Sequence, residues 1–164
     1  MSGTTIHEGR CFCGAVRFTL EGEPQLMAYC HCDSCRHWSA GPVSAFTLWR
    51  PDELQLTAGA DEIAEYEGNP GTADERLLSR RRWCTVCGGH IYTEHPAMGL
   101  IDVPAAVIKD FDFKPVFHVH YQETVHQMVD GLPKYQDLPA QAGGSGRQLP
   151  ELAEAPLASG RDAR

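Results

Sequence analysis

The sequence has no excess of basic residues and no long apolar segment. Lys and Arg together number 14 against 22 for Asp and Glu, which gives a formal net charge of −8. Nucleic-acid binding depends on clustered Lys and Arg, so this balance argues against a nucleic acid as the main partner. No apolar run is long enough to cross a membrane, and the opening residues lack the apolar segment of a signal peptide. The composition therefore predicts a cytoplasmic protein that binds neither nucleic acid nor a membrane.

Strong helix signals are also scarce, whereas short segments that alternate apolar and polar residues recur. Residues 15–23 (AVRFTLEGE) place Val16, Phe18 and Leu20 at every second position, which predicts a half-buried strand. With 16 Gly and 11 Pro, the chain is suited to many tight turns. We therefore expect a mostly β fold. Further strands are expected at residues 43–50, 54–59, 62–68 and 116–121, and the run Arg80-Arg81-Arg82 is expected on a solvated strand face.

One domain is expected to cover residues 1–138. The chain of 164 residues is long enough for a single domain with a core of its own. The residues after Leu138 contain no aromatic side chain and are rich in Ala, Gly and Pro, so they can bury little apolar surface. Residues 139–164 are therefore predicted to form a flexible tail.

What the sequence does contain is seven cysteines. Where thiols stay reduced, such a number indicates metal binding or catalysis before disulfides, and an odd count leaves one cysteine out of any complete disulfide set. The cysteines form three groups, which are Cys11-x-Cys13-Gly14, Cys30-x-Cys32-x-x-Cys35 and Cys84-x-x-Cys87-Gly88.

A glycine follows the first and third groups but not the middle group. In a metal-binding turn the residue after the last Cys often has a positive φ, which Gly adopts at little cost, and backbone N–H groups then point at the thiolate sulfurs. The first and third groups therefore look like two halves of one site. Together, Cys11, Cys13, Cys84 and Cys87 supply the closed tetrahedral ligand set of a structural zinc.

The middle group keeps three sulfurs, those of Cys30, Cys32 and Cys35, for a second metal. Three protein ligands and an open fourth position are typical of catalytic zinc, and soft thiolates select zinc over magnesium or calcium. Three thiolates give the zinc a net negative formal charge, which weakens it toward water and leaves it suited to holding another sulfur as a thiolate. The pattern predicts two zinc ions per chain and sulfur chemistry at the second.

Other interpretations of the middle group remain open. Cys32 and Cys35 could form a redox pair, although no thioredoxin-like βαβ pattern surrounds them and Cys30 would be left out. A disulfide-stapled fold is another alternative. His31, His37 or a distant histidine could also supply a fourth ligand, which would make both zinc ions structural.

Two further local structures are predicted. A turn or short helix begins at Asp33-Ser34, because both are good N-cap residues, and it carries residues 35–38. At residues 116–121 (VFHVHY), the alternation places His118 and His120 on one face of a strand. Such paired histidines are more often surface residues or satisfied core residues than metal ligands.

In this order the three cysteine groups resemble the glutathione-dependent formaldehyde-activating enzyme family, which also includes centromere protein V. The resemblance covers about residues 9–138, and Gly89 stands where the family often has a small hydroxyl residue. The matching segments are Cys11-x-Cys13-Gly14-x-Val16-x-Phe18, Cys30-His31-Cys32-x-x-Cys35-Arg36 with Gly41-Pro42, Cys84-x-x-Cys87-Gly88 and Asp130-Gly131-Leu132-Pro133.

The resemblance implies a fold of the β-tent type, with a structural zinc on the outer four cysteines and a catalytic zinc on Cys30, Cys32 and Cys35. The family's named activity joins glutathione and formaldehyde into S-hydroxymethylglutathione, a reaction classed with the carbon–sulfur lyases. The implied partners are therefore a small thiol such as glutathione and an aldehyde. The alternatives are a non-catalytic carrier of glutathione and a zinc-stabilised interaction module.

Arg36 and His37, beside Cys35, are the first candidates for substrate binding. Glutathione carries two carboxylates, which cationic side chains near the site would orient. Arg36 could instead pair with Asp33 or with a backbone carbonyl, and Trp38 is expected to pack rather than to recognise substrate.

Overall fold

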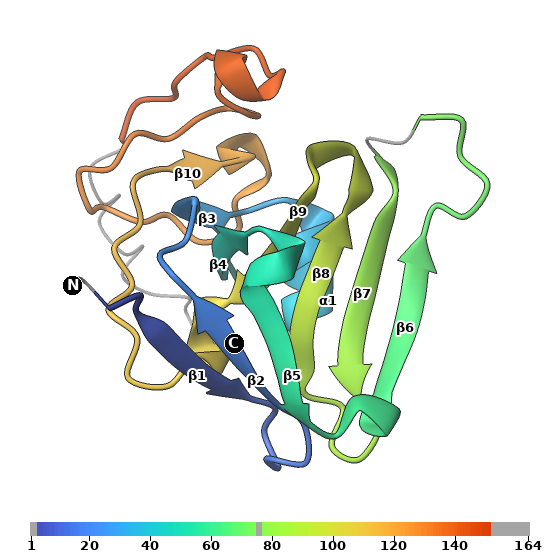
Figure 1. Cartoon of the computed structure of the whole chain (residues 1–164). Coiled ribbons are helices and arrows are strands. Elements are labelled where there is room, and N and C mark those ends of the chain that lie inside the picture. Colours follow the sequence, from blue (N-terminus) through green and yellow to red (C-terminus); the bar gives the residue numbers. More distant parts are fainter. Residues whose placement is uncertain (1–2, 75–76, 152–164) are drawn as a thin grey trace, which may run out of the picture. The chain divides into compact units, whose positions relative to one another are not determined.

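The structure, a computed structural model, describes residues 3–74 and 77–151 and is mostly β, as the sequence predicted (Figure 1). The chain divides into two compact units. The described residues of the ranges 1–28 and 45–115 form the first unit, and those of the ranges 29–44 and 116–151 form the second. Among the described residues, no helix has the length and apolar character needed to span a membrane.

The first unit contains an antiparallel sheet of three strands with β2 at its centre (Figure 1). Its strands are β1 (Ile6–Arg10), β2 (Arg17–Glu21) and β5 (Leu54–Ala58). Phe18 and Leu20 are buried, as the alternation in the sequence predicted. Their side chains place one face of this sheet in the core of the unit.

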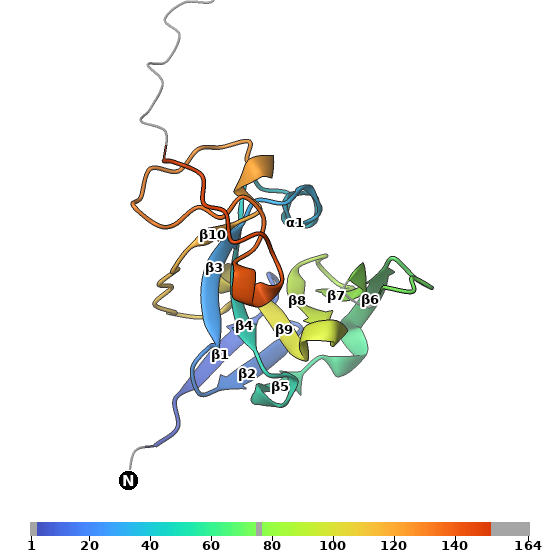
Figure 2. The same ribbon diagram turned by 90° about the horizontal axis from the view of Figure 1, so that it is seen from above.

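Five further strands pair antiparallel in the order β4-β9-β8-β7-β6 (Figures 1 and 2). The strands predicted at residues 43–50, 54–59 and 62–68 are confirmed, and Gly59 (φ 71°) opens the turn between the second and third of them. The bounds are β4 (Ser44–Trp49, with Ser44 in the second unit), β6 (Ile63–Gly68), β7 (Ser79–Cys84), β8 (His90–His95) and β9 (Leu100–Pro104).

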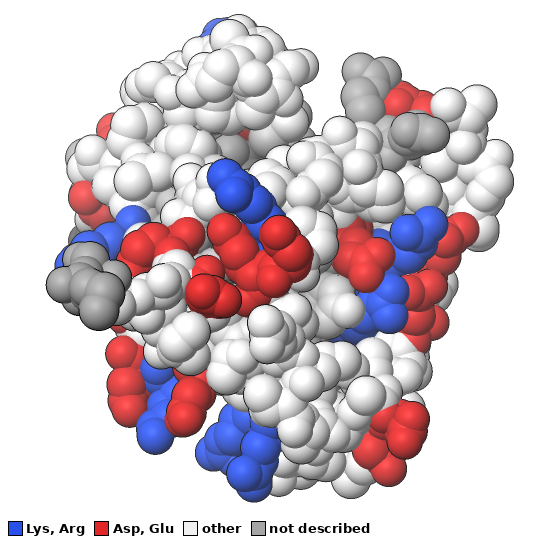
Figure 3. Space-filling model, in the orientation of Figure 1, with Lys and Arg blue, Asp and Glu red and all other residues white. Residues whose placement is uncertain are grey.

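The basic run on β7 is matched by carboxylates on the neighbouring strands. Arg80 Nε lies 3.1 Å from Glu67 Oε2 on β6, and Arg82 lies 2.8 Å from Glu94 Oε1 on β8. Figure 3 shows basic and acidic side chains interleaved on the right of that view. Cross-strand pairs of this kind stabilise a sheet modestly, and they leave these two arginines with little uncompensated charge for a polyanion.

Apolar side chains of both strand sets form the core of the first unit. Trp49 is completely buried, and its indole N–H donates to Thr47 Oγ1 at 2.7 Å. Thr47 in turn donates to the carbonyl of Val103 at 2.9 Å, so the polar atoms of this pair are satisfied inside the core. The core residues are Cys11, Val16, Phe18, Leu20, Trp49, Cys84, Ile91, Ile101, Val103 and Ile108.

The second unit has little regular structure. Tyr29 and Cys30, at the end of β3 (Leu26–Cys30), pair in parallel with β10 (His118–Val119), and α1 (Asp33–Ser39) follows closely. Its short 3₁₀ turns are η6 (Tyr121–Glu123) and η7 (Ala140–Ala142), while the first unit has η1 (Pro51–Glu53), η2 (Ala60–Glu62), η4 (Pro96–Met98) and η5 (Ala105–Val107).

The strand predicted over residues 116–121 is wrong except at its centre. Only His118 and Val119 are in strand conformation, because His120 adopts a left-handed backbone with φ 53° and turns the chain into η6. His118 is completely buried, whereas the His120 side chain is 30% exposed. The two histidines therefore do not share one face of a continuous strand.

Residues 139–151, in the segment predicted as a tail, are hydrogen-bonded to the residues before it. The Gln136 N–H donates to the carbonyl of Arg147 at 2.8 Å, and the Leu149 N–H donates to that of Lys134 at 2.8 Å. Residues 152–164 lie outside the described residues. The boundary at residue 138 stays a prediction, and the segment directly after it contributes contacts to the second unit.

Candidate metal centres

The two outer cysteine groups come together in the first unit. Cys11 follows β1 and Cys84 ends β7, so the two sheets bring thiols that are far apart in sequence to one place. Cys13 Sγ lies 3.6 Å from Cys11 Sγ and 3.9 Å from Cys84 Sγ. With Cys87, all four sulfurs lie within 4.8 Å of one another, as the partition of the sequence predicted.

Backbone groups surround these sulfurs in the way the glycines indicated. Gly14 and Gly88 have φ values of 79° and 71°, the left-handed conformation that Gly adopts most easily. The Val16 N–H donates to Cys11 Sγ at 3.3 Å. Backbone N–H groups of Cys13 and Gly89 lower the pKa of the Cys87 thiol to about 6, which favours the thiolate that a metal requires.

The middle group forms a separate cluster in the second unit. Cys30 ends β3, Cys32 is the N-cap of α1, and Cys35 lies in its first turn. The Sγ atoms of Cys30 and Cys32 are 3.5 Å apart, and all three sulfurs lie within 4.8 Å of one another. The helix predicted here is confirmed, but its cap is neither Asp33 nor Ser34. Cys32 Sγ takes that role and accepts the N–H of Cys35 at 3.3 Å.

Both sulfur sets fit a tetrahedral zinc ion. With Zn–S bonds of about 2.3 Å, a tetrahedron has S–S edges of about 3.8 Å. The sulfur pairs measured in the two clusters are 3.6, 3.9 and 3.5 Å apart. Hydrogen bonds with Cys30 and Cys35 lower the pKa of the Cys32 thiol to about 2, whereas the corresponding bonds raise the pKa of Cys30. The three thiols thus oppose ionising together, and a bound divalent cation would offset that repulsion.

No side chain closes the middle cluster among residues 3–74 and 77–151. No His, Asp or Glu ligand atom joins the three sulfurs within 4.8 Å. The ring of His31 bonds elsewhere, and His37, whose side chain is 85% exposed, has Nδ1 3.6 Å from Asp33 Oδ2. A histidine-closed site therefore has no support in the described structure. All seven cysteines are free thiols, so the structure contains no disulfide staple.

Arg36 makes both of the structural contacts that the sequence allows as alternatives to substrate binding. Its Nε donates to the carbonyl of His31 at 2.9 Å, and its terminal nitrogen donates to Asp33 Oδ1 at 3.3 Å. The side chain is only 17% exposed. Arg36 therefore ties the segment that carries the three cysteines to α1, and it can meet a substrate carboxylate only on its remaining N–H groups.

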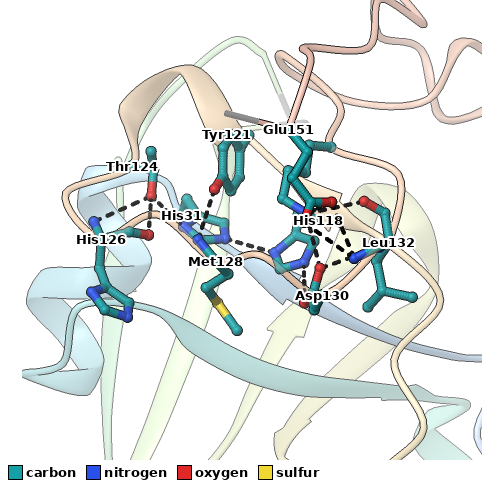
Figure 4. A network of polar contacts seen from close by, with 11 residues as sticks. His31, His118, Tyr121, Thr124, His126, Met128, Asp130, Leu132 and Glu151 are labelled. Carbon is teal, nitrogen blue, oxygen red and sulfur yellow. Dashed lines mark hydrogen bonds and ion pairs between the residues drawn. The ribbon is translucent and has the colours of Figure 1, made fainter. Parts of the chain in front are cut away.

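Sequence reasoning did not find a buried polar chain that begins at His31 (Figure 4). His31 Nε2 lies 2.9 Å from His118 Nδ1, and His118 Nε2 lies 2.9 Å from Asp130 Oδ2. On the other side of the ring, His31 Nδ1 lies 2.9 Å from Thr124 Oγ1. Burial lowers the pKa of His31 to about 4 and also lowers that of His118, so both imidazoles are neutral at pH 7.

A buried cation ends this chain. Lys134, whose side chain is 1% exposed, places Nζ 2.8 Å from Asp130 Oδ1 and 3.3 Å from Glu151 Oε2. It also donates to the carbonyl of Leu132 at 3.1 Å and lies over the ring of Tyr121. Asp130 belongs to the motif Asp130-Gly131-Leu132-Pro133, which resembles the family's closing motif. That motif was the one sequence signal that pointed to this network. Nothing in the sequence joined it to His31.

The fold and its thiols define a mostly β protein with one four-sulfur and one three-sulfur candidate metal centre. The sequence model of the glutathione-dependent formaldehyde-activating enzyme family matches residues 6–123. The chain belongs to that family.

Among the proteins similar to this chain are two relatives and a solved structure. A putative glutathione-dependent formaldehyde-activating enzyme of Halomonas elongata is 26% identical over 139 residues, which cover 80% of each chain. An uncharacterized lyase of Schizosaccharomyces pombe is 28% identical over 86 residues, 52% of this chain and 56% of that relative's length. A crystal structure of a Rhodobacter sphaeroides protein superposes with a TM-score of 0.49 at 20% identity, covering 64% of this chain and 90% of that one.

Proposed function

We propose that this protein is a zinc-dependent enzyme of the carbon–sulfur lyase type that acts on a thiol–aldehyde adduct. Glutathione and formaldehyde, or a related aldehyde, are the proposed pair, and S-hydroxymethylglutathione is the proposed product. The observation that carries the proposal is the unequal sulfur count, with four sulfurs in one cluster and three in the other. Family membership and the names of the relatives support it.

The two clusters have different proposed roles. Cys11, Cys13, Cys84 and Cys87 hold a structural zinc, and the fold is of the β-tent type. Cys30, Cys32 and Cys35 hold the catalytic zinc. When bound there, zinc would supply a position at which a further thiol is kept as its thiolate. The N–H of Cys35 supports this site by fixing Cys32 Sγ from the side of α1.

The proposed reaction needs neither an oxidant nor a reductant. A bond forms between the thiol sulfur and the aldehyde carbon, the π bond of the carbonyl breaks with its electron pair moving to the oxygen, and the thiol proton ends on that oxygen. Such a reaction suits the cytoplasm, where thiols stay reduced. Arg36 and His37 are proposed to orient the substrate carboxylates, with the exposed His37 as the more accessible of the two.

An exchange measurement tests the catalytic claim. The interconversion of glutathione, formaldehyde and their adduct is followed by NMR saturation transfer, with and without the zinc-loaded protein. We expect faster interconversion with the protein and no acceleration by the Cys30→Ser variant at the same concentration. An unchanged rate with the wild-type protein would contradict catalysis of this reaction. Calorimetry then separates the alternatives, because a carrier binds glutathione and an interaction module does not.

A further inference from the structure

The hydrogen-bond network that runs from Thr124 through His31 and His118 to Glu151 contains buried polar groups that the proposed reaction does not require. His31 and His118 are completely buried and Lys134 is 2% exposed, all within the second unit. Burying such groups costs free energy, and well-packed apolar side chains of similar volume often replace them without loss of stability. Buried polar groups that cost free energy of folding therefore lie directly beside the three-cysteine cluster.

The hydrogen bonds of this chain have one consistent direction. His118 Nε2 donates to the carboxylate of Asp130, so the neutral His118 ring accepts at Nδ1 from His31 Nε2, and His31 Nδ1 is left as an acceptor beside the Thr124 hydroxyl. The Thr124 hydroxyl also lies 2.7 Å from the carbonyl of His126, so its single proton has two acceptors in reach. The carboxylate of Asp130 accepts at the far end, where Lys134 balances its charge.

His31 connects this hydrogen-bond network to the three-cysteine cluster. It stands between Cys30 and Cys32, so its backbone sets how the two sulfurs face each other across 3.5 Å. That backbone is fixed on both sides, since the His31 N–H donates to the carbonyl of Val119 and the His31 carbonyl accepts from Arg36. The ring is then fixed by Thr124 and His118, as Figure 4 shows.

The partners of His31 are themselves anchored to the end of the described chain. The backbone of His118 pairs with that of Pro133 and Tyr135 on the far side of β10. Glu151 accepts from Lys134 and from the N–H of Gly131, and it thereby closes the loop that carries Asp130. The position of His31 therefore depends on residues more than a hundred positions later in the sequence.

We propose that His118 and Asp130 are positioning residues of the three-cysteine site, which act by holding His31 between two of the metal-ligating thiols. The proposal rests on the proposed function only for its link to catalysis, because its direct consequence is the spacing of the sulfurs. Removing the carboxylate of Asp130 releases His118, then His31, and loosens the Cys30–Cys32 pair. The four-cysteine cluster has no part in this chain and keeps its metal unchanged.

The test compares Asp130→Asn with Asp137→Asn in the full-length zinc protein. Asp137 is a matched control, because its carboxylate also accepts several hydrogen bonds in the second unit, from Leu138 and Ser145, without contact to His31. Zinc is withdrawn with a chromophoric chelator, and cadmium-substituted samples give a separate NMR signal for each cluster. For Asp130→Asn we expect about tenfold or more weaker metal binding and a displaced signal at the three-cysteine cluster alone.

A pair of milder variants keeps the test decisive if Asp130→Asn does not fold. Thr124→Val removes the hydroxyl beside His31, whereas Thr124→Ser keeps it, so the serine variant should restore the metal affinity and the cadmium signal. The proposal is overturned if Asp130→Asn and Asp137→Asn change the three-cysteine signal equally, or if the valine and serine variants bind metal alike. The wild-type protein could bind metal at both clusters and still not accelerate the exchange reaction. That result would contradict the proposed function but not the positioning role.

Discussion

The four-cysteine and three-cysteine clusters are held in place by different kinds of support. The four-cysteine cluster depends on its own turns, where Gly14 and Gly88 take positive φ and nearby N–H groups reach the sulfurs. The three-cysteine cluster has no such glycine. Its surroundings come from α1 and from side chains far along the sequence, including His118 and Asp130. The backbone support of the four-cysteine cluster thus comes from the turns that carry its cysteines, whereas the support of the three-cysteine cluster includes side chains from distant parts of the second unit.

The largest expected effect comes from removing one sulfur from either cluster. Cys84 is completely buried and ends β7, so Cys84→Ser should release the metal of the four-cysteine cluster and unfold the first unit. Cys30→Ser should lower the metal content from two ions per chain to one and leave the fold intact. Metal analysis with thermal unfolding checks both variants. Equal loss of structure in the two would contradict the difference between the clusters.

The next effect concerns the buried cation of the second unit. Lys134→Met keeps the aliphatic stem but leaves Asp130 and Glu151 without their shared partner. Because breaking a buried ion pair leaves uncompensated charge, we expect unfolding to become easier by about 3 kcal/mol. Denaturant unfolding measures this change. The double variant with Glu151→Gln should recover part of the loss, and no recovery would mean that charge is not its cause.

A smaller effect is expected at the turn of the four-cysteine cluster. An added Cβ at Gly88 would meet no atom within 4 Å, so Gly88→Ala tests only the cost of its φ of 71°. That cost is about 1–2 kcal/mol. In zinc-loaded protein, zinc at the four-cysteine cluster should pass to a chelator more readily, and zinc at the three-cysteine cluster should be unaffected. Equal changes at both zinc ions would show that the clusters are coupled.

The smallest expected effect sharpens the assignment of Arg36. Asp33→Asn weakens the contacts that Asp33 makes with Arg36 and His37, so both side chains are freer to meet a carboxylate of glutathione. Because exposed ion pairs contribute up to about 1 kcal/mol, glutathione should bind up to about fivefold more tightly in calorimetry. Asp52→Asn, which removes an exposed carboxylate in the first unit, controls for the change in net charge. Weaker binding by Asp33→Asn would mean that Arg36 serves the turn and not the substrate.

The sequence predicted the parts of this protein that follow from local chemistry. Glycines after Cys13 and Cys87 separated the two clusters because positive φ is a local backbone property. Alternation located β2, with Phe18 and Leu20 inward, because strand periodicity is local as well. Both signals needed only neighbouring residues.

The parts that the sequence did not predict depend on residues that meet only after folding. The left-handed turn at His120 ended the strand predicted over residues 116–121, and no Gly or Pro marked that position. The cap of α1 is Cys32 and not Asp33 or Ser34. The sequence did not predict it because a thiol is not among the usual capping residues. Lys134 and Glu151 are ordinary surface residues by composition, and only the fold makes them partners of Asp130.

The Cys32 sulfur takes part both in the N-cap of α1 and in the candidate three-cysteine metal site. Its lone pairs accept the Cys35 N–H at the start of α1, and the same atom belongs to the candidate metal site. A bound metal ion changes the electron density on this sulfur, and with it the strength of the hydrogen bond to that N–H. The Cys35 amide proton is therefore a built-in probe, whose chemical shift reports from inside the chain whether the cluster is loaded.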